Sequence, residues 1–233
     1  MYEGIKRYYL YSPSLRIAHW VWTLAIGVLF ITGIYIGSPF FIGTAGNDTT
    51  FVDLHALTMN WIRFFHFSFG YILLAALILR FGIMPFRKAD RLIIPKVWTK
   101  AYWDNTIDTL KNYLFIAKSH RPYVRNPLAR TAYFGLFLLL IFEVITGFAM
   151  YGRSNPDGFW DKLCGWIIPI LGGEYQVHRW HHLVNWIIVI FVVVHIYLVI
   201  REDILEKGGE VSSMVNGNKF FEHEPADISD VRE

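Results

Sequence analysis

The chain is poor in cysteine and in charged residues, and both shortages restrict its chemistry. Its single cysteine, Cys164, excludes a disulfide framework, a cysteine-ligated iron–sulfur cluster, a four-cysteine zinc site and thioether attachment of haem. Only 18% of its 233 residues are charged, against about 25% in an average soluble domain. Hydrophobic residues make up 54% and aromatic residues 18%. This composition favours a membrane protein whose metal chemistry rests on its nine histidines.

A cleavable signal segment and a nucleic-acid-binding tract are also missing. The first apolar run begins only after Arg16 and is too long for the hydrophobic part of a signal peptide. We therefore expect it to remain in the mature protein. The formal net charge is only +3, and no basic tract alternates with aromatic residues as nucleic-acid binding requires. Nucleic acid is not an expected partner.

Four mainly apolar stretches are long enough to cross a bilayer, which takes about 20 residues in a helix. They run over residues 17–37, 61–84, 129–151 and 183–200. Because hydrocarbon offers no water to backbone polar groups, each stretch is expected to be helical. The predicted fold is all-α and integral to the membrane, a four-transmembrane-helix bundle that forms a single domain over residues 1–233.

The distribution of lysine and arginine predicts the orientation. Most of these residues lie in the N-terminal segment, in the loop 85–128 and in the tail 201–233. The other two connections carry only Arg153, Lys162 and Arg179. By the positive-inside rule, both termini and the loop 85–128 are expected to be cytoplasmic.

The cytoplasmic loop contains a predicted amphipathic helix. Apolar residues between Val97 and Ile116 alternate at helical spacing with Lys100, Asp104 and other charged residues. Such a helix is typical of a segment that lies on the membrane surface. Packing beneath the bundle explains the pattern equally well.

Four histidines fall within the predicted spans at two depths. His19 and His195 lie near the cytoplasmic ends of their spans, whereas His66 and His181 lie near the outer ends. Ionisable residues inside a membrane are rare and indicate function. A haem that transfers electrons without binding a ligand takes one imidazole on each side of its iron. The sequence therefore predicts two stacked bis-histidine haems.

Helical geometry supports the choice of ligands on the fourth span. The fourteen residues from His181 to His195 come within about 40° of whole turns and separate the two by about 21 Å along the axis. His178 and His182 would point about 100° and 140° away from His195. One face of this helix can thus serve both sites. A zinc site at His178, His181 and His182 is the rival reading, and only Glu174 is placed to complete it.

Small and charged residues near these depths have two readings each. Gly33 and Gly70 would leave room for a macrocycle, or would simply let helices approach. Arg80 would neutralise a haem propionate, or would snorkel to the interface. Glu143, inside the third span, would serve quinone protonation or pair locally. The triplet Ile-Thr-Gly occurs at residues 31–33 and again at 145–147, which indicates a duplication or close helix packing.

Around these histidines the sequence resembles the membrane cytochrome b subunit of nickel–iron hydrogenases. Its first signature is resembled by Arg16-Ile17-Ala18-His19-Trp20 followed by Thr32-Gly33. Its second is resembled by His178-Arg179-Trp180-His181-His182-Leu183, followed by Trp186, Phe191 and His195. Segments 62–67, 201–203 and 214–217 also resemble the family, so the match covers nearly the whole chain. Arg179 departs from the family pattern, which usually has a small residue there.

The resemblance implies a subunit that carries electrons through two haem b groups in the bacterial inner membrane. The small and large subunits of a periplasmic hydrogenase would deliver electrons to a haem on His66 and His181. A second haem, on His19 and His195, would pass them to a membrane quinone. A cytochrome b subunit of a formate dehydrogenase or thiosulfate reductase would share this logic. A membrane anchor without redox activity is the remaining alternative.

Overall fold

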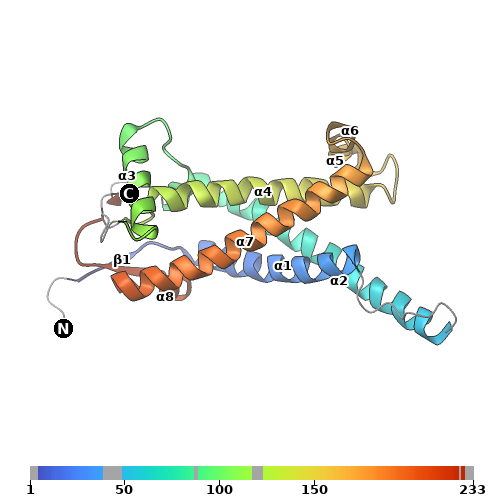
Figure 1. Cartoon of the computed structure of the whole chain (residues 1–233), viewed down its shortest axis with the longest axis horizontal. Coiled ribbons are helices and arrows are strands. Elements are labelled where there is room, and N and C mark those ends of the chain that lie inside the picture. The colour runs from blue at the N-terminus through green and yellow to red at the C-terminus, as the bar shows by residue number, and fades with distance from the viewer. Residues whose placement is uncertain (1–4, 39–48, 87–88, 117–122, 226, 229–233) are drawn as a thin grey trace. The chain divides into compact units, whose positions relative to one another are not determined.

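The computed structural model describes residues 5–38, 49–86, 89–116, 123–225 and 227–228. Within them, four helices are long and apolar enough to cross a membrane (Figure 1). These are α1 (Pro13–Gly37), α2 (Thr49–Ile83), α4 (Pro127–Gly152) and α7 (Glu174–Glu206). Large apolar side chains on them are exposed, such as Ile31 at 67% and Ile190 at 63%, as on surfaces that face lipid. The predicted all-α, four-span membrane fold is confirmed.

Two of the helices extend beyond the predicted apolar stretches. Helix α2 begins at Thr49 rather than at residue 61, and α7 runs from Glu174 to Glu206 rather than over 183–200. Hydropathy marks only the part of a helix that suits lipid, whereas the helix itself continues into polar turns. Ahead of α7, Gly172 and Gly173 have φ angles of 92° and 104°, a left-handed backbone that favours glycine.

Two long helices begin with the same sequence device, a polar cap followed by proline. The backbone N–H of Leu15 donates to Ser12 Oγ at 3.2 Å, and that of Ala129 donates to Asn126 Oδ1 at 2.7 Å. Proline is the first residue of both α1 and α4, where a backbone N–H would have no partner within the helix. These caps determine where the two helices start.

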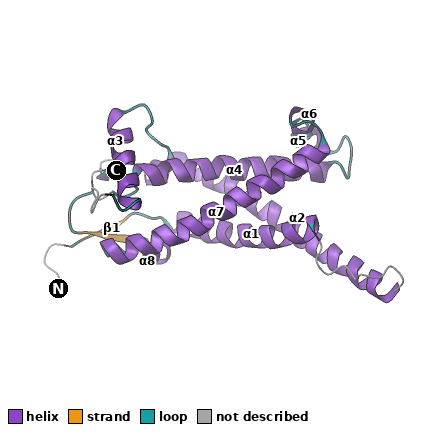
Figure 2. Cartoon of the chain, in the orientation of Figure 1, coloured by secondary structure: helices purple, strands orange, loops and turns teal. Residues whose placement is uncertain are grey.

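The remaining elements are short. Helix α3 (Lys100–Tyr113) follows two single turns, η1 (Met84–Phe86) and η2 (Ala89–Ile93), in the loop between α2 and α4. Helices α5 (Phe159–Cys164) and α6 (Ile167–Ile170) connect α4 to α7, and α8 (Glu210–Asn216) follows α7. Strands β1 (Lys6–Tyr9) and β2 (Asn218–Phe221) pair antiparallel, with Lys6 opposite Phe221. Figure 2 shows how far helix dominates over strand.

The chain forms two compact units, and each of the four long helices contributes to both. Unit 1 comprises residues 1–17, 80–141 and 187–233, and unit 2 comprises residues 18–79 and 142–186. Unit 1 therefore contains β1, β2, α3 and α8, whereas unit 2 contains α5 and α6.

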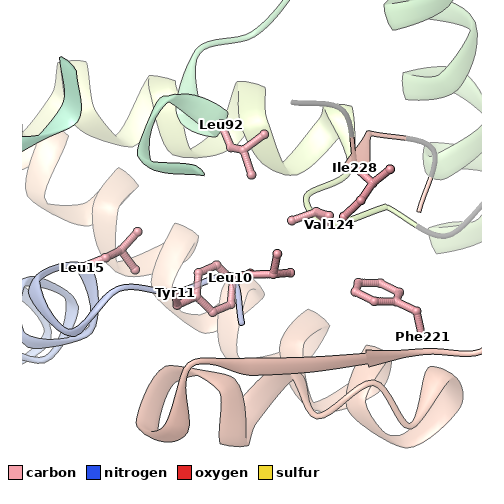
Figure 3. Packing of buried hydrophobic residues seen from close by; sticks show 7 residues of the cluster. All are labelled: Leu10, Tyr11, Leu15, Leu92, Val124, Phe221 and Ile228. Atoms are coloured by element: carbon pink, nitrogen blue, oxygen red, sulfur yellow. The ribbon is translucent and has the colours of Figure 1, made fainter. Parts of the chain in front are cut away.

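Unit 1 packs around an apolar cluster drawn from distant parts of the chain (Figure 3). Its buried members are Leu10, Tyr11, Leu15, Leu92, Val124, Phe221 and Ile228. Buried ion pairs surround the cluster: Arg130 with Asp227 at 2.8 Å, Arg80 with Asp90 at 3.5 Å, and Lys219 with Glu210. The Asp227 carboxylate also accepts the backbone N–H groups of Val124 at 2.6 Å and Arg125 at 3.1 Å. The Asp227 contacts join the C-terminal segment to the loop before α4 and to Arg130 of α4.

Helix α3 attaches to unit 1 by its polar side. Tyr102, Thr109 and Asn112 are its buried residues, and Tyr102 Oη donates to the carbonyl of Pro127 at 2.8 Å. From α7, the Arg201 guanidinium donates to the carbonyl and the side-chain oxygen of Asn112, both at 3.2 Å. The predicted helix of the loop therefore exists, and hydrogen-bonding residues form its buried face.

Unit 2 has an aromatic core beside the connection from α4 to α7. Trp160 of α5 stacks on Phe148 of α4 with ring centroids 3.9 Å apart, and its Nε1 donates to Tyr71 Oη of α2 at 2.7 Å. Cys164 is buried in the same cluster. These contacts fix the connection against the ends of α2 and α4.

Candidate functional site

The predicted ligand His66 is held by a threonine of the neighbouring helix. Its Nδ1 lies 2.8 Å from Thr32 Oγ1 of α1. The Thr32 hydroxyl donates its own proton to the carbonyl of Val28 at 2.6 Å. It must therefore accept the proton of His66 Nδ1, which leaves the Nε2 lone pair of His66 free for a metal. Thr32 is only 6% exposed, so this bond is shielded from water.

The predicted ligand His181 is held in the same way from α4. Its Nδ1 lies 2.9 Å from Thr146 Oγ1, and the Thr146 hydroxyl donates to the carbonyl of Phe142 at 2.8 Å. Thr146 is fully buried. A second acceptor is present here, because Glu143 Oε2 lies 2.8 Å from the same Nδ1. Again Nε2 is the nitrogen that remains for a metal.

Both threonines are followed by glycine, and both glycines contact the imidazole concerned. A Cβ atom built on Gly33 would lie 3.3 Å from Cε1 of His66, and one built on Gly147 would lie 3.4 Å from Cε1 of His181. The absence of a side chain thus lets each ring edge lie against the helix backbone. The repeated triplet Ile-Thr-Gly is two copies of one histidine-holding device.

His66 and His181 both belong to unit 2, and their imidazoles are close enough to interact electrostatically. Each ring has its Nδ1 bonded and its Nε2 available, in a part of the protein built from apolar helices. This donor set fits a bis-histidine haem, which needs two neutral imidazoles and no other protein ligand. Within the described parts of the chain, no three histidine, cysteine or acidic side chains form a group that could hold a metal ion alone.

The other predicted site residues of unit 2 have different surroundings. A Cβ atom on Gly70 would meet no protein atom within 4 Å, so protein packing does not explain this glycine. The ring of His19 contacts that of Trp20 edge-on at 5.1 Å. His182 packs against Gly37, where a Cβ atom would lie 2.5 Å from its Cε1.

In unit 1, His195 lies among aromatic rings. Its Nδ1 is 3.3 Å from Tyr133 Oη, and its ring is parallel to that of Phe191 at 5.9 Å. The guanidinium of Arg125 lies over the Tyr133 ring at 5.4 Å. The pairing of His195 with His19 joins residues of different units and stays a prediction.

Arg80, also in unit 1, is 5% exposed and bound to Asp90. Its Nη2 donates to the carbonyl of Asp90 at 2.9 Å, in addition to the side-chain ion pair. The proposed role of Arg80 toward a haem propionate is not tested by this contact. The neighbouring carboxylate does offset part of its positive charge.

Sequence reasoning missed the partners of the histidines. The Thr32 and Thr146 hydroxyls, the Tyr133 hydroxyl and the charge of Arg125 were not among the predicted site residues. A signal for the threonines existed in the repeated triplet, because both copies occur at the depth of the outer histidines. No comparable pattern marks Tyr133 or Arg125.

Comparison with known proteins identifies the family of this chain. The family model for prokaryotic cytochrome b561 matches residues 10–217. The "Probable Ni/Fe-hydrogenase B-type cytochrome subunit" of Cupriavidus necator is 41% identical over 224 residues, which cover 94% of this chain and 89% of the relative. The protein of the same name from Azotobacter vinelandii is 37% identical, with 94% and 91% covered.

A relative from Escherichia coli K12 is more distant but equally complete. The "Probable Ni/Fe-hydrogenase 1 B-type cytochrome subunit" is 32% identical over 222 residues, which cover 92% of each chain. The family match over residues 10–217 thus includes all four spans and the predicted histidine ligands on them. The chain belongs to the prokaryotic cytochrome b561 family, among the b-type cytochromes of nickel–iron hydrogenases that its sequence resembles.

Proposed function

We propose that this chain is the di-haem b subunit that carries electrons from a periplasmic nickel–iron hydrogenase to a membrane quinone. The observation that carries the proposal is the pair His66 and His181, each bound at Nδ1 so that Nε2 is left for iron. Family membership implies haem b as the cofactor. The names of the relatives support hydrogenase, rather than formate dehydrogenase or thiosulfate reductase, as the partner.

The residues of the outer site would hold and insulate the cofactor. Bound haem supplies an iron that alternates between two oxidation states. His66 and His181 would be its axial ligands, and Thr32 and Thr146 fix the ring orientation. Burial of these hydroxyls keeps water from competing for Nδ1. A group held by these two imidazoles would transfer electrons without binding a substrate.

The inner haem is proposed from sequence spacing. His19 and His195 would be its ligands, and Arg80 would lie near a propionate. Tyr133 contacts this ligand, because its hydroxyl oxygen lies 3.3 Å from Nδ1 of His195. At the outer haem, Gly33 and Gly70 would provide clearance along α1 and α2. From the inner haem, electrons would reach a membrane quinone.

Helix α3 would lie on the cytoplasmic surface of the bilayer. Trp103, Ile107, Leu110 and Leu114 fall within about 60° of one another around the helix, and all four are exposed. Lys100 and Lys111 border this stripe on one side, and Asp104 and Asp108 lie further round the helix on that same side. Apolar residues bordered by lysine and turned from acidic residues are typical of an interfacial helix.

Spin labels on α3 test this placement. After Cys164 is replaced by serine, a label at Ile107→Cys should collide readily with oxygen, which concentrates in lipid. A label at Asp108→Cys, the matched exposed position, should collide mainly with a water-soluble nickel chelate. Equal exposure of both labels to the chelate in liposomes would contradict the placement.

Haem content with ligand variants tests the function itself. Chain purified from haem-replete cells should show a reduced-minus-oxidised b-type spectrum and two haems per polypeptide. His66→Ala or His181→Ala should abolish one spectral component, and His19→Ala or His195→Ala the other. His223→Ala, an exposed histidine of the tail, is the control and should retain both components. A colourless wild-type chain would refute the proposal.

The partner can be identified in membranes of the native organism. Hydrogen should reduce the haem of these membranes, and added quinone should reoxidise it. A protein captured with the intact complex should contain nickel. A captured partner that contains molybdenum instead would assign the chain to a formate dehydrogenase or thiosulfate reductase.

A further inference from the structure

The two copies of the histidine-holding device are not equivalent. Thr32 of α1 and Thr146 of α4 occupy the same position in their triplets, but the residue three positions earlier is Leu29 in α1 and Glu143 in α4. In a helix, residues three apart lie on the same face. His181 is therefore approached by a hydroxyl and a carboxylate, whereas His66 is approached by the Thr32 hydroxyl and by the backbone carbonyl of Leu29, which carries no net charge.

We propose that Thr32 and Thr146 are positioning residues for the two axial ligands, and that Glu143 makes His181 the stronger electron donor to the iron. This inference rests on the proposed function, because it concerns the ligands of the outer haem. The sequence allows two roles for Glu143, quinone protonation or local pairing. The proposal gives it a third role, as the hydrogen-bond partner of the haem ligand His181.

The hydroxyl bonds determine which nitrogen can bind iron. Each threonine hydroxyl donates its proton to a backbone carbonyl, at 2.6 Å for Thr32 and 2.8 Å for Thr146. Its oxygen can then only accept, so Nδ1 of the histidine must carry the proton. A ring with the opposite tautomer would present an N–H to the iron instead of a lone pair. The threonines thus select the binding-competent form of both rings.

The carboxylate of Glu143 has a different effect. A negatively charged acceptor at Nδ1 draws the proton away from the ring and raises the basicity of Nε2, which stabilises ferric over ferrous iron. The second oxygen of Glu143, Oε1, is buried and has no hydrogen-bond partner among the described residues. A carboxylate half-satisfied inside a membrane is costly, and glutamine would fill the same space without that cost. Comparison of Glu143 with glutamine therefore isolates the effect of a charge at this position.

The threonines can be tested by replacing them with valine, which has the same shape but no hydroxyl. Thr32→Val should weaken binding of the outer haem by about 10–100-fold, as loss of a ligand's hydrogen-bond partner typically does. Thr146→Val should have a smaller effect, because the Glu143 carboxylate that remains at His181 is a stronger acceptor than the Leu29 carbonyl that remains at His66. Thr32→Ser restores the hydroxyl and should restore binding. The readout is the rate of haem transfer to apomyoglobin.

Thr23→Val is the matched control for these variants. Thr23 lies on the same helix and makes the same bond to a backbone carbonyl four residues earlier, at 2.9 Å, but its side chain is exposed. The outer haem should be retained in this variant as in the wild type. If Thr32→Val and Thr146→Val also retain it with wild-type transfer rates, the positioning role is refuted.

The role of Glu143 can be tested by redox titration of the outer haem, which is the spectral component that is lost in His66→Ala. Glu143→Gln keeps the shape and removes the charge, and should shift this midpoint potential upward. Glu143→Leu makes the two halves of the site alike and should shift it at least as far. The electron paramagnetic resonance of the ferric haem should change in both. Glu174→Gln removes the same charge at the exposed start of α7 and should leave the potential unchanged.

The outcomes distinguish failure of the proposed function from failure of the inference on Thr32, Thr146 and Glu143. An upward shift in Glu143→Gln but not in Glu174→Gln supports the inference, and an unchanged potential in Glu143→Gln overturns it. If the His66 and His181 variants lose haem but the threonine and glutamate variants behave as wild type, only the inference fails. If the wild-type chain binds no haem, both fail.

Discussion

The two units of the chain bury polar side chains for different purposes. In unit 1 they are opposite charges in pairs, such as Arg130 with Asp227 and Arg80 with Asp90. In unit 2 the buried threonines accept the protons of imidazoles. Paired charges hold separate segments of the chain together. A hydroxyl that binds Nδ1 of an imidazole instead orients the ring and leaves the lone pair of Nε2 available. The contrast separates a scaffold from a ligand-binding region.

Removing a charge from the scaffold should have the largest effect on stability. Asp227→Ala removes the carboxylate that is paired with the buried Arg130 and frees two backbone N–H groups. The expected loss is about 3–5 kcal/mol in the free energy of unfolding. Thermal unfolding in detergent measures it. Glu222→Ala, an exposed acidic residue nearby, is the control and should change stability by less than about 0.5 kcal/mol.

Asp227→Ala also tests whether unit 2 depends on the buried charges of unit 1. If the scaffold charges act only on unit 1, Asp227→Ala should unfold unit 1 more easily while His66 and His181 still bind haem at low temperature. Loss of the outer haem before any unfolding would show that unit 2 depends on the same charges.

A smaller effect is expected from adding one methyl group beside a histidine. Gly33→Ala places a Cβ atom 3.3 Å from Cε1 of His66, so the ring must shift by a few tenths of an ångström. Overpacking of this kind costs about 1–3 kcal/mol and should weaken outer haem binding accordingly. Haem retention during dialysis measures it.

Gly70→Ala sharpens the same test, because a Cβ atom there meets no protein atom within 4 Å. In chain prepared without haem, alanine should stabilise α2 by about 0.5–1 kcal/mol. If Gly70 provides clearance for a macrocycle, the same variant should lose haem affinity. Unchanged affinity would assign Gly70 to lipid contact.

The smallest effect is expected at the exposed ion pairs of unit 2. Arg153 pairs with Asp161 at 3.2 Å and with Glu174 at 2.7 Å. The backbone N–H of Asp157 and the Arg153 guanidinium hold the pKa of Asp161 below its ordinary value of 3.8. The lowered pKa contributes stability above about pH 3.8, and this contribution is lost as the pH falls through the folded-state value.

Asp161→Asn should therefore lower the unfolding temperature slightly at neutral pH and not at all in strong acid. Solvent screens exposed pairs, so the change should be far smaller than in Asp227→Ala. Unfolding curves of both variants across the acid range provide the comparison. An equal effect of the two substitutions at neutral pH would show that the buried ion pair of unit 1 contributes no more stability than the exposed ion pair of unit 2.

Much of the fold could be predicted because lipid imposes simple rules. Apolar length predicted the four spans, and polar caps such as Ser12-Pro13 mark where helices begin. The ends of α2 and α7 could not be predicted, because hydropathy does not register a helix that continues into polar turns. The helix of the loop was predicted, but its buried face was not, since Tyr102 and Thr109 bury hydroxyls that a hydrophobic pattern assigns to water.

The histidines were predictable as residues, and their surroundings were not. A histidine within an apolar span stands out against its neighbours, as His66 does in α2. The partner that fixes its tautomer is an ordinary threonine on another helix, and threonine is common in spans for other reasons. Only the repetition of the triplet carried information about Thr32 and Thr146.

The sequence alone determined that this chain lies in a membrane, that it crosses it four times, and that imidazoles are its potential metal ligands. These properties depend on composition and on spacing along single helices, which the chain carries wherever it folds. Tertiary structure decided which nitrogen of each imidazole is bonded, that Glu143 reaches His181, and that Arg80 is paired with Asp90. Hydrogen bonds act over about 3 Å, so such choices exist only after separate helices have packed side by side.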